Sequence, residues 1–483
     1  MSLKNKAISS FNWTILDGLV SQGFLFIVGI VLARILSPEE IGIIGYLTVF
    51  LAIANIIVEA GFGSALIRKT TVTIKDYNTV FFINLITAFG LYVLLYLTAE
   101  IIASFFETPI LKEILQLAGA VLIINALSLI HKTQYTKFLK FKLQAIVSVT
   151  AAAFSGICAL IMAYNGYGVW SLVALAVVRP AIVCIVYWIT NDWRPKWIFS
   201  YKSFKELFDF GYKLLLANMI NTIYHNIFYI VIGKYFSTAS LGFYTRAEQF
   251  KTPVSSNITA AIQRISFPIL STIKDDEKRL KMAFQKFIRF AVYINFPILL
   301  GLIAMAKPMV FLLIGEKWET SILYFQLLCV AGLLYPLQIL HLNLLLVKGH
   351  SNLNLRLEVI KKLILVPIIF LSIQYGILFM IYGLVLFAFI EFFINSFYTR
   401  KLIGYSWKEQ FFDILPILFL SIGTALIMFS ILYFGLSNLI TFVLQILIGI
   451  IVFIFGSKLL KLPEFDEVYQ KVRGVLSKFS KSS

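Results

Sequence analysis

Charged residues are scarce in this sequence. Only 14% of its 483 residues are Asp, Glu, Lys or Arg, whereas 60% are hydrophobic. A polar fraction this small does not cover the surface of a soluble globule of this length, because proteins folded in water keep their charged residues outside. The deficit predicts that a lipid bilayer solvates most of the chain.

Cysteines and acidic residues are also few. Cys158, Cys184 and Cys329 lie singly inside apolar stretches, which argues against a disulfide framework and a cysteine metal site. Asp and Glu number 24 against 42 Lys and Arg, a formal charge of +18. Such an excess often indicates nucleic-acid binding, but here the basic residues occupy short loops between apolar runs. We expect no nucleic-acid partner, no metal and no cofactor.

Apolar runs long enough to cross a membrane recur along the chain. About 20 helical residues span a hydrocarbon core of roughly 30 Å. Fourteen candidate spans begin near Phe11, Ile41, Asn78, Glu113, Gln144, Trp170, Glu206, Gly242, Lys286, Ile322, Val359, Phe379, Ile414 and Leu439. The predicted fold class is therefore an all-α polytopic membrane protein with 14 transmembrane helices.

The distribution of basic residues predicts the orientation. An even number of spans puts both termini on one side, and the tails and loops of that side hold 28 of the 42 Lys and Arg. The opposite loops hold four, which are Lys112, Lys234, Lys307 and Lys317. Cytoplasmic loops carry the excess of Lys and Arg. We expect a multi-pass protein of the bacterial inner membrane with cytoplasmic N- and C-termini.

The chain after the last span has two possible interpretations. Apolar residues recur there at spacings of three or four, with lysines elsewhere on the turn; they are Phe465, Val468, Val472, Leu476 and Phe479, and Lys471, Lys478 and Lys481. This pattern favours a cytoplasmic amphipathic helix lying on anionic lipid. A frayed basic tail would have the same composition.

An internal repeat relates the two halves of the chain. ARILSPEEIG (33–42) has a counterpart 200 residues later in GKYFSTASLG (233–242), with a cation, a Ser, an aliphatic residue and a Gly in register. With an offset of 210, Gln116 matches Gln326 and His131 matches His341. Because six spans separate the copies, both have the same orientation, and their pseudo-twofold axis runs along the membrane normal.

The repeat predicts the domain organisation. We expect an N-terminal six-helix lobe (1–200), a C-terminal six-helix lobe (201–402), two additional transmembrane helices (403–462) and a cytoplasmic basic tail (463–483). Two lobes of this kind enclose a cavity, and rocking of one against the other exposes it to each side in turn. The architecture therefore favours a transporter.

Five segments resemble a known family, the polysaccharide-export flippases of the multidrug/oligosaccharidyl-lipid/polysaccharide superfamily. They are LARILSPEEIG (32–42), EAGFGSALI (59–67), IGK (232–234), LGFY (241–244) and GEKW (315–318). The resemblance implies two six-helix lobes and a substrate of the undecaprenyl-pyrophosphate-linked oligosaccharide type, flipped from the cytoplasmic to the outer leaflet. The sequence departs from the family pattern at Glu59, where Asp is frequent, and at Phe228, where an acidic residue is common.

Arg179 is the clearest candidate for substrate binding. It lies nine residues into the span that begins at Trp170, about 14 Å deep at 1.5 Å per residue. A charged side chain at that depth costs about 2.5–3.5 kcal/mol, so it needs a partner, a cavity or a task. Its planar fork of donors suits bidentate contacts with phosphate oxygens. Alternatively, it is a structural bracket to a carbonyl or to Glu59.

Other intramembrane cations follow in the eighth span. Arg246 and Lys251 are candidate contacts for the pyrophosphate, and Glu248 lies three residues before Lys251, where the two can pair. Three further substrate-binding candidates lie nearer the span ends and are Arg34, Lys213 and Arg264. Snorkelling to the interface also explains cations at such positions.

Asp17 and Glu59 are the candidates for ion coupling. Both lie in the cytoplasmic third of adjacent spans, where a carboxyl group can carry a proton or form a structural bridge between helices. Glu391 is a similar residue in the twelfth span. His131 and His341 are expected to be hydrogen-bonded packing residues.

The alternatives to a flippase differ in the residues they require. An integral-membrane enzyme would need a nucleophile or paired carboxylates, and the sequence offers neither, so we expect no enzymatic activity. A cation-coupled multidrug exporter of the same superfamily is the second candidate and would line its cavity with acids. The expected partners are a lipid-linked oligosaccharide with a pyrophosphate headgroup, membrane lipids and the polysaccharide polymerase machinery, and a monomer is expected.

Overall fold

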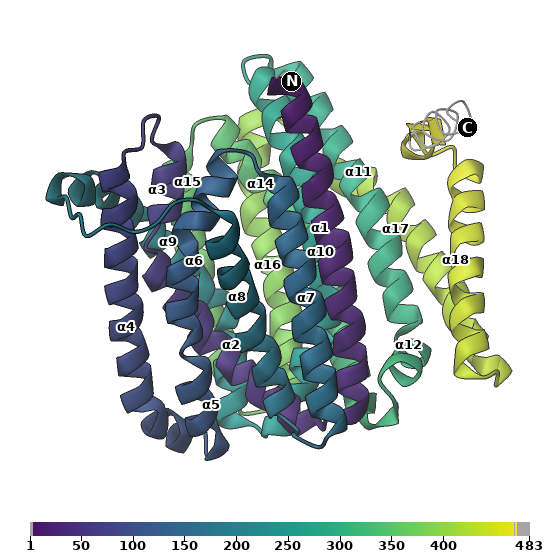
Figure 1. Ribbon diagram of the computed structural model, residues 1–483. Helices are drawn as coiled ribbons and strands as arrows, with labels where there is room; N and C mark the ends of the chain where they lie inside the picture. Colours follow the sequence, from purple (N-terminus) through teal and green to yellow (C-terminus); the bar gives the residue numbers. More distant parts are fainter. Residues whose placement is uncertain (1–2, 468, 471–483) are drawn as a thin grey trace, which may run out of the picture. The chain divides into compact units, whose positions relative to one another are not determined.

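The protein is helical throughout the part that the structure describes. The computed structural model describes residues 3–467, 469 and 470, and no strand occurs among them (Figure 1). The α-helices are α1 (Leu3–Ile35), α2 (Pro38–Glu59), α3 (Phe62–Arg68), α4 (Ile74–Phe105), α5 (Ile110–Ala118), α6 (Val121–Lys137), α7 (Phe141–Tyr164), α8 (Trp170–Thr190), α9 (Tyr201–Tyr235), α10 (Thr238–Thr272), α11 (Glu277–Ala304), α12 (Ala306–Leu313), α13 (Glu319–Leu333), α14 (Tyr335–Val347), α15 (Ser351–Ile373), α16 (Ile377–Ile403), α17 (Trp407–Ser430) and α18 (Asn438–Leu459). Two 3₁₀ turns, η1 (Glu316–Trp318) and η2 (Ile431–Phe434), complete the set.

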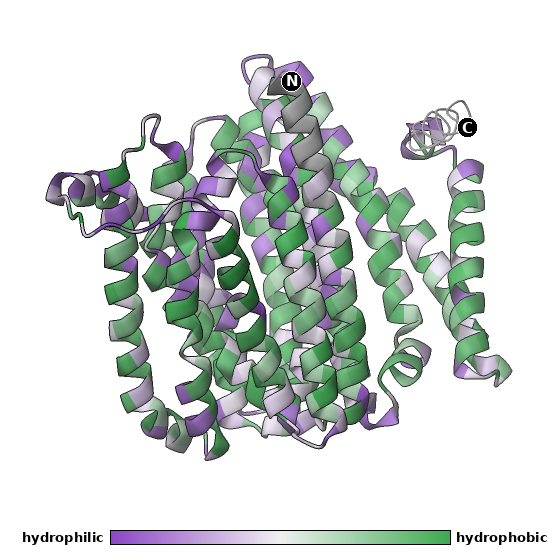
Figure 2. Ribbon diagram, viewed as in Figure 1, coloured by the Kyte–Doolittle hydropathy of each residue, from purple (hydrophilic) through white to green (hydrophobic). Residues whose placement is uncertain are grey.

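Twelve helical segments of the described chain are long and apolar enough to cross a membrane. Figure 2 shows hydrophobic residues along their lengths and hydrophilic residues in the loops. This confirms the all-helical membrane class. Fourteen spans were predicted, and the other two fall on α10 and α15, which have 35 and 23 residues. These helices are long enough to span, but each carries at least four charged residues, so the count of fourteen stays a prediction.

The chain packs as two compact units, with the border inside α10. Unit 1 comprises Met1–Thr245 and unit 2 comprises Arg246–Ser483. In unit 1, α7 packs between α1 and α8, while α4 packs on α5 and α6, and α2 packs on α9. In unit 2, α11 packs on α13, α14 and α17, and α15 packs on α16. The border at 200/201 and the other predicted domain limits remain predictions, and most of the predicted tail, from 471 onward, lies outside the described residues.

The helix ends repeat with the same offsets as the sequence. α1 ends at Ile35 and α2 begins at Pro38, whereas α9 ends at Tyr235 and α10 begins at Thr238, 200 residues later. Further along, the ends of α6 and α14 and the starts of α7 and α15 are each 210 residues apart. Each of the matched glutamines donates a hydrogen bond to a backbone carbonyl of an earlier helix. Gln116 donates to the Tyr96 carbonyl (3.4 Å) and Gln326 to the Ile303 carbonyl (3.0 Å).

Local capping residues set several of these helix ends. Ser37 caps α2 and exchanges hydrogen bonds with Glu40 in a capping box, and Pro38 occupies the first helical position. At the other end of α2, Ala60 and Gly61 adopt left-handed conformations with φ of 44° and 71°. A side chain at Gly61 would meet the backbone of Gly211 on α9, so glycine is required there for space as well as for conformation.

A cation in the turn between α3 and α4 fixes that corner of unit 1. Lys69 Nζ lies 3.2 Å from Asp76 Oδ1 and 2.9 Å from Glu206 Oε2 on α9. Burial lowers the pKa of Lys69, but its hydrogen bonds to Glu206 and Asp76 outweigh that effect, so the pKa is raised above its usual value. Lys137 donates to the carbonyl oxygens of Leu66 and Lys69 at the end of α3, where cations compensate unpaired carbonyls.

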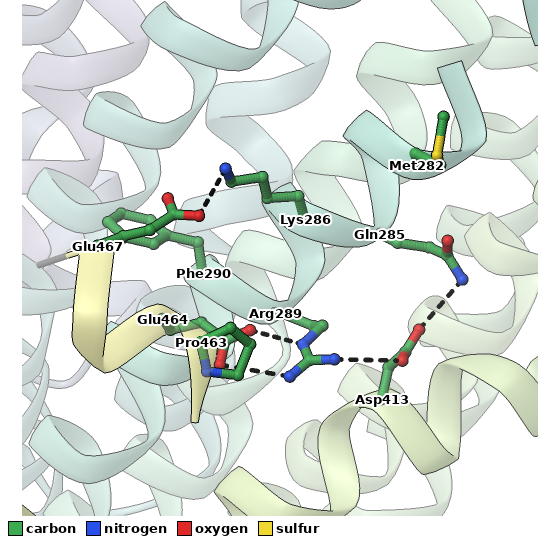
Figure 3. Close-up of a pocket in the computed structure, with 9 residues that line it drawn as sticks. All are labelled: Met282, Gln285, Lys286, Arg289, Phe290, Asp413, Pro463, Glu464 and Glu467. Atoms are coloured by element: carbon green, nitrogen blue, oxygen red, sulfur yellow. Dashed lines mark hydrogen bonds and ion pairs between the residues drawn. The ribbon is translucent and has the colours of Figure 1, made fainter. Parts of the chain in front are cut away.

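Polar contacts tie the last two helices to α11 in unit 2. A cavity of about 300 Å³ lies where α11, α17 and the segment after α18 meet, and Figure 3 shows the residues that line it. Arg289 on α11 donates to Glu464 (2.6 Å) and lies 3.8 Å from Asp413 on α17, and Lys286 pairs with Glu467 (2.6 Å). These ion pairs couple α17 and the chain beyond α18 to α11.

Candidate functional site

A polar cavity of about 510 Å³ lies inside unit 1. Five helices, α1, α2, α6, α7 and α8, contribute its walls. The lining residues are Asp17, Asn55, Val58, Glu59, Asn125, Ser128, Leu129, Lys132, Gln144, Ser148, Arg179, Pro180, Val183 and Tyr187. We call this space the unit 1 cavity. It brings together three residues predicted from the sequence, Asp17, Glu59 and Arg179.

Arg179 is the most informative side chain of the unit 1 cavity. It is half-buried on α8, and Asp17 on α1 interacts with it electrostatically. Among the side chains that the structure describes, none forms a hydrogen bond or an ion pair with the Arg179 guanidinium. Among the described residues, Arg179 forms neither the bracket to Glu59 nor the one to a carbonyl, and the choice between the two predicted roles stays a prediction. A guanidinium in a cavity with its donors unused is suited to bind an oxyanion.

A second cation, Lys132 on α6, also lines the unit 1 cavity. The side chain is exposed, and it has no ion-pair partner in the described part of the chain. Sequence analysis did not select it, because the charge count that set the orientation assigned it to a loop. The sequence signal that could have identified Lys132 is its position directly after His131, which the structure shows to be buried in α6.

The acids and amides of the cavity form hydrogen bonds within and between the helices that line it. Asp17 Oδ1 accepts a hydrogen bond from Ser21 Oγ (2.9 Å) one turn along α1. Asn125 on α6 donates to Asn55 on α2 (2.8 Å), which joins two helices across the cavity wall. Glu59 lines the cavity at the end of α2. Two carboxylates and two cations therefore face the same space without forming ion pairs with one another.

The predicted cations of the eighth span lie in unit 2 and have different surroundings. Arg246 is 5% exposed, its guanidinium carbon lies 5.5 Å from the centre of the Trp318 ring, and its Nε atom is buried without a hydrogen-bond partner. Lys251 Nζ lies 2.9 Å from Glu248 Oε1, so the predicted pair is confirmed. Thr252 also donates to Glu248 (2.9 Å). Arg246 is thus held by an aromatic ring, and Lys251 by a carboxylate.

Unit 2 also contains a buried charge cluster that sequence analysis found only in part. Lys361 on α15 is 2% exposed, and it lies 2.5 Å from Glu358 on the same helix and 2.8 Å from Glu391 on α16. Glu391 was grouped with the acids that either carry a proton or bridge helices, and here it pairs with Lys361 on the neighbouring helix. Lys361 was missed because it lies near the predicted start of a span, where lysines are usual.

Three of the predicted substrate-binding cations lie outside the unit 1 cavity. Arg34 is exposed at the end of α1, and Lys213 is exposed on α9 with its ammonium 5.8 Å from the Tyr212 ring. Arg264 is exposed on α10 in unit 2. All three side chains are exposed, and they are long enough to extend toward a membrane interface. Their assignment to the substrate remains a prediction.

The repeat-related histidines are both buried, but only His341 forms the predicted hydrogen bond, and neither ring nitrogen of His131 has a hydrogen-bond partner among the described residues. His131 is fully buried, and its ring packs edge-on against Trp188 and Trp193 at 5.0 and 5.4 Å. His341 is fully buried too, and its Nδ1 atom lies 2.8 Å from Thr399 Oγ1. Neither lines the unit 1 cavity.

These features define a multi-pass helical membrane protein with a polar, partly charged cavity between its helices, which is the architecture of a membrane transporter. The sequence profile of the polysaccharide biosynthesis protein family matches residues 31–323. The chain belongs to this family. The resemblance stated from the sequence motifs is therefore confirmed.

Individual proteins with a similar sequence or fold agree with the family. The chain is 24% identical over 438 residues to the lipopolysaccharide biosynthesis protein WzxC of Escherichia coli (strain K12), covering 89% of this chain and 88% of that protein. Its fold matches the lipid II flippase MurJ with a TM-score of 0.74 at 17% identity, covering 94% of this chain and 98% of the other. A multidrug resistance transporter of the MATE family and MOP superfamily matches with a TM-score of 0.59 at 15% identity, covering 82% and 99%.

Proposed function

We propose that this protein flips an undecaprenyl-pyrophosphate-linked oligosaccharide from the cytoplasmic to the outer leaflet of the bacterial inner membrane by alternating access. The observation that carries the proposal is the Arg179 guanidinium, which lines a cavity of about 510 Å³ and has no hydrogen bond or ion pair with the side chains that the structure describes. Membership of the polysaccharide biosynthesis protein family supports a sugar-bearing cargo. The product would serve surface polysaccharide synthesis.

The proposed architecture has fourteen spans in two six-helix lobes, followed by α17 and α18. The two helices that are too polar to count as apolar spans, α10 and α15, are the eighth and eleventh. Their charges are Arg246, Glu248, Lys251 and Arg264 on α10 and Arg356, Glu358, Lys361 and Lys362 on α15. A span can carry such residues where it faces protein or an aqueous cavity instead of lipid. Both termini are then cytoplasmic, and the protein works as a monomer.

The proposed ligands of the headgroup are intramembrane cations. Arg179 on α8 binds the pyrophosphate, and Lys132 on α6, which also lines the unit 1 cavity, supports it. Arg246 and Lys251, which lie in unit 2, are further proposed ligands of the pyrophosphate, with Lys251 partly neutralised by Glu248. Arg34, Lys213 and Arg264 receive the anion nearer the ends of the spans. Phosphate oxygens accept the hydrogen bonds that these side chains donate.

The membrane potential favours the proposed direction. An anion that moves outward from a negative cytoplasm gains about 2.3 kcal/mol per charge per 100 mV. A pyrophosphate headgroup is therefore driven toward the outer leaflet without a coupling ion. Asp17 and Glu59 would act when the empty carrier resets, since both line the cavity and either carboxyl group can bind a proton or a cation there.

A cation-coupled multidrug exporter is the second candidate. The fold match to a MATE-family transporter favours it, as do the two carboxylates in the unit 1 cavity. The two cations in the same cavity disfavour it, because a cationic drug would meet Arg179 and Lys132. The two functions differ in what accumulates when the protein is absent.

Single and combined substitutions test the assignment of the headgroup ligands. The variants R179A, R246A, K251A and the triple variant are expressed in a strain lacking the gene, and surface polysaccharide is measured. R179A should lower export at least about tenfold, since a charge-assisted hydrogen bond contributes about 1.5–3 kcal/mol. R356A, which removes an exposed arginine from α15, is the matched control and should export normally.

Membrane levels of each variant are measured by immunoblot, so that loss of the protein is distinguished from loss of transport. R179K should restore part of the export, because lysine keeps the charge but loses the planar fork. Full export in all three single variants and in the triple variant would eliminate the assignment.

A further inference from the structure

A basic groove of about 870 Å³ lies where α16 ends and α17 begins in unit 2. Its walls are Phe397, Arg400 and Lys401 from α16, and Ser406, Trp407 and Lys408 from the start of α17. We call it the α16–α17 groove. Gly404, with φ of 63°, ends α16, and Ser406 caps α17, so the two helices turn within three residues. The side chains at the end of α16 and at the start of α17 therefore surround the same groove.

The groove carries three cations and no carboxylate among its lining residues. Arg400, Lys401 and Lys408 are exposed, and none of them forms an ion pair with any residue that the structure describes. The nearest acid in sequence, Glu409, is already bound to Lys281 Nζ (2.7 Å) and to the Ser406 backbone nitrogen (2.7 Å). The cavity in Figure 3 differs from this groove, because its cations Lys286 and Arg289 both contact carboxylates. The charge of the α16–α17 groove is therefore available to a ligand.

Two further features orient this charge toward an anion. The Lys401 ammonium lies 5.0 Å from the centre of the Phe397 ring, which positions the side chain by a cation–π contact and leaves it exposed. The groove also borders the first turn of α17, where the helix dipole favours negative charge. A phosphate group is therefore a suitable ligand for the three cations and for the first turn of α17.

The aromatic residues of the groove distinguish a lipid from a soluble anion. Phe397 and Trp407 are each 46% exposed, although both are large apolar side chains. Aromatic residues gather at the level of the lipid headgroups, where one part of the ring is wet and the other contacts acyl chains. The predicted orientation puts this corner on the cytoplasmic side, where basic pockets between transmembrane helices bind anionic headgroups.

We propose that the α16–α17 groove binds the headgroup of an anionic phospholipid. The phosphate is held by Arg400, Lys401 and Lys408, while Phe397 and Trp407 contact the glycerol and the upper acyl chain. This site is separate from the unit 1 cavity and does not depend on what the protein transports. It gives the protein a preference for membranes rich in anionic lipid.

The test is lipid binding to the purified full-length chain. The protein is delipidated in detergent and titrated with phosphatidylglycerol or with phosphatidylcholine, and bound lipid is counted by native mass spectrometry. The wild type should prefer phosphatidylglycerol. Each cation near a membrane surface contributes about fivefold to the affinity for an anionic lipid, so R400Q, K401Q and K408Q should each weaken binding about fivefold and the triple variant at least about tenfold.

A matched triple variant removes the same charge elsewhere. K202Q/K205Q/K278Q replaces three exposed lysines outside the groove, and it should bind phosphatidylglycerol as the wild type does. Equal binding by the groove variant and the wild type would overturn the proposal, as would an equal loss in the matched variant. Displacement of phosphatidylglycerol by 10 mM inorganic phosphate, on the order of its cellular concentration, would identify a soluble anion as the occupant and overturn the lipid assignment.

Because a triple variant can fold poorly, thermal unfolding is recorded for all variants. The three single variants keep two of the cations and provide an independent measure. Wild-type affinity in all three single variants would contradict the proposal even if the triple variant did not fold.

Discussion

Gly42 on α2 and Gly242 on α10 occupy equivalent positions of the two repeats and pack directly against each other in unit 1. A Cβ atom at Gly42 would lie 3.1 Å from the Gly242 nitrogen, and one at Gly242 would lie 3.2 Å from the Gly42 nitrogen. The same added atoms would also meet the carbonyl oxygens of Thr238 and Pro38. The contact is nearly symmetric, since each added atom would meet the backbone of the other glycine's helix.

Replacing Gly242 by alanine should therefore destabilise the protein. The methyl group has no space beside the Pro38 carbonyl, and overpacking costs about 1–3 kcal/mol. G90A is the matched control, since nothing lies within 4 Å of the Cβ position of Gly90 and alanine is the better helix residue by about 1 kcal/mol. Thermal unfolding in detergent should show a lower melting temperature for G242A only. Equal melting temperatures would show that the backbones do not approach so closely.

The pair formed by Glu248 and Lys251 should show energetic coupling. Their side chains are 23% and 18% exposed, between surface and buried cases, so E248A should cost about 1–3 kcal/mol by leaving the lysine unpaired. K251A should cost less, because Thr252 still donates to Glu248. The double variant should recover part of the loss. A double-mutant cycle measures the coupling, and strictly additive losses would mean that the pair contributes nothing.

Lys361 should be the most sensitive charged residue of unit 2. The variant K361M leaves Glu358 and Glu391 without their shared cation in a buried site, a change that costs about 3–5 kcal/mol. Replacing one of the acids as well, in K361M/E358Q, should recover part of the stability. R356M on the same helix is the control and should change stability by less than about 0.5 kcal/mol. If K361M unfolds like R356M, the cluster is not formed in the membrane.

The sequence predicted the helical architecture well wherever periodic signals are strong. Span lengths and the offset of 200 located the ends of α1, α2, α9 and α10, because capping residues and apolar runs are local features. The short helices α3, α5 and α12 were not separated, since a helix of two turns has no apolar period of its own. α10 and α15 were counted among the predicted spans, although each carries four charged residues. Charged residues in a span need a protein partner or a cavity, and a local sequence pattern does not show either one.

The candidate site was predictable only in part. Arg179 was selected because a cation near the middle of a span needs an explanation, and the structure places it in the unit 1 cavity. Lys132 and Lys361 were missed, since lysines near span ends are common. Lys361 pairs with Glu358 on its own helix and with Glu391 on α16, whereas Lys132 has no ion-pair partner among the described residues. Sequence spacing identified the pair of Glu248 and Lys251, three residues apart on one helix. Contacts between helices depend on packing that no local pattern encodes.

The most direct test of the central claim is the fate of lipid-linked sugars when the protein is absent. The gene is deleted, and the undecaprenyl-pyrophosphate intermediates are extracted and assigned to a leaflet by their access to an enzyme added outside. Our account predicts that one species accumulates in the cytoplasmic leaflet, and that wild type but not R179A restores its export. Unchanged lipid intermediates together with altered drug sensitivity would contradict the flippase and favour the multidrug exporter.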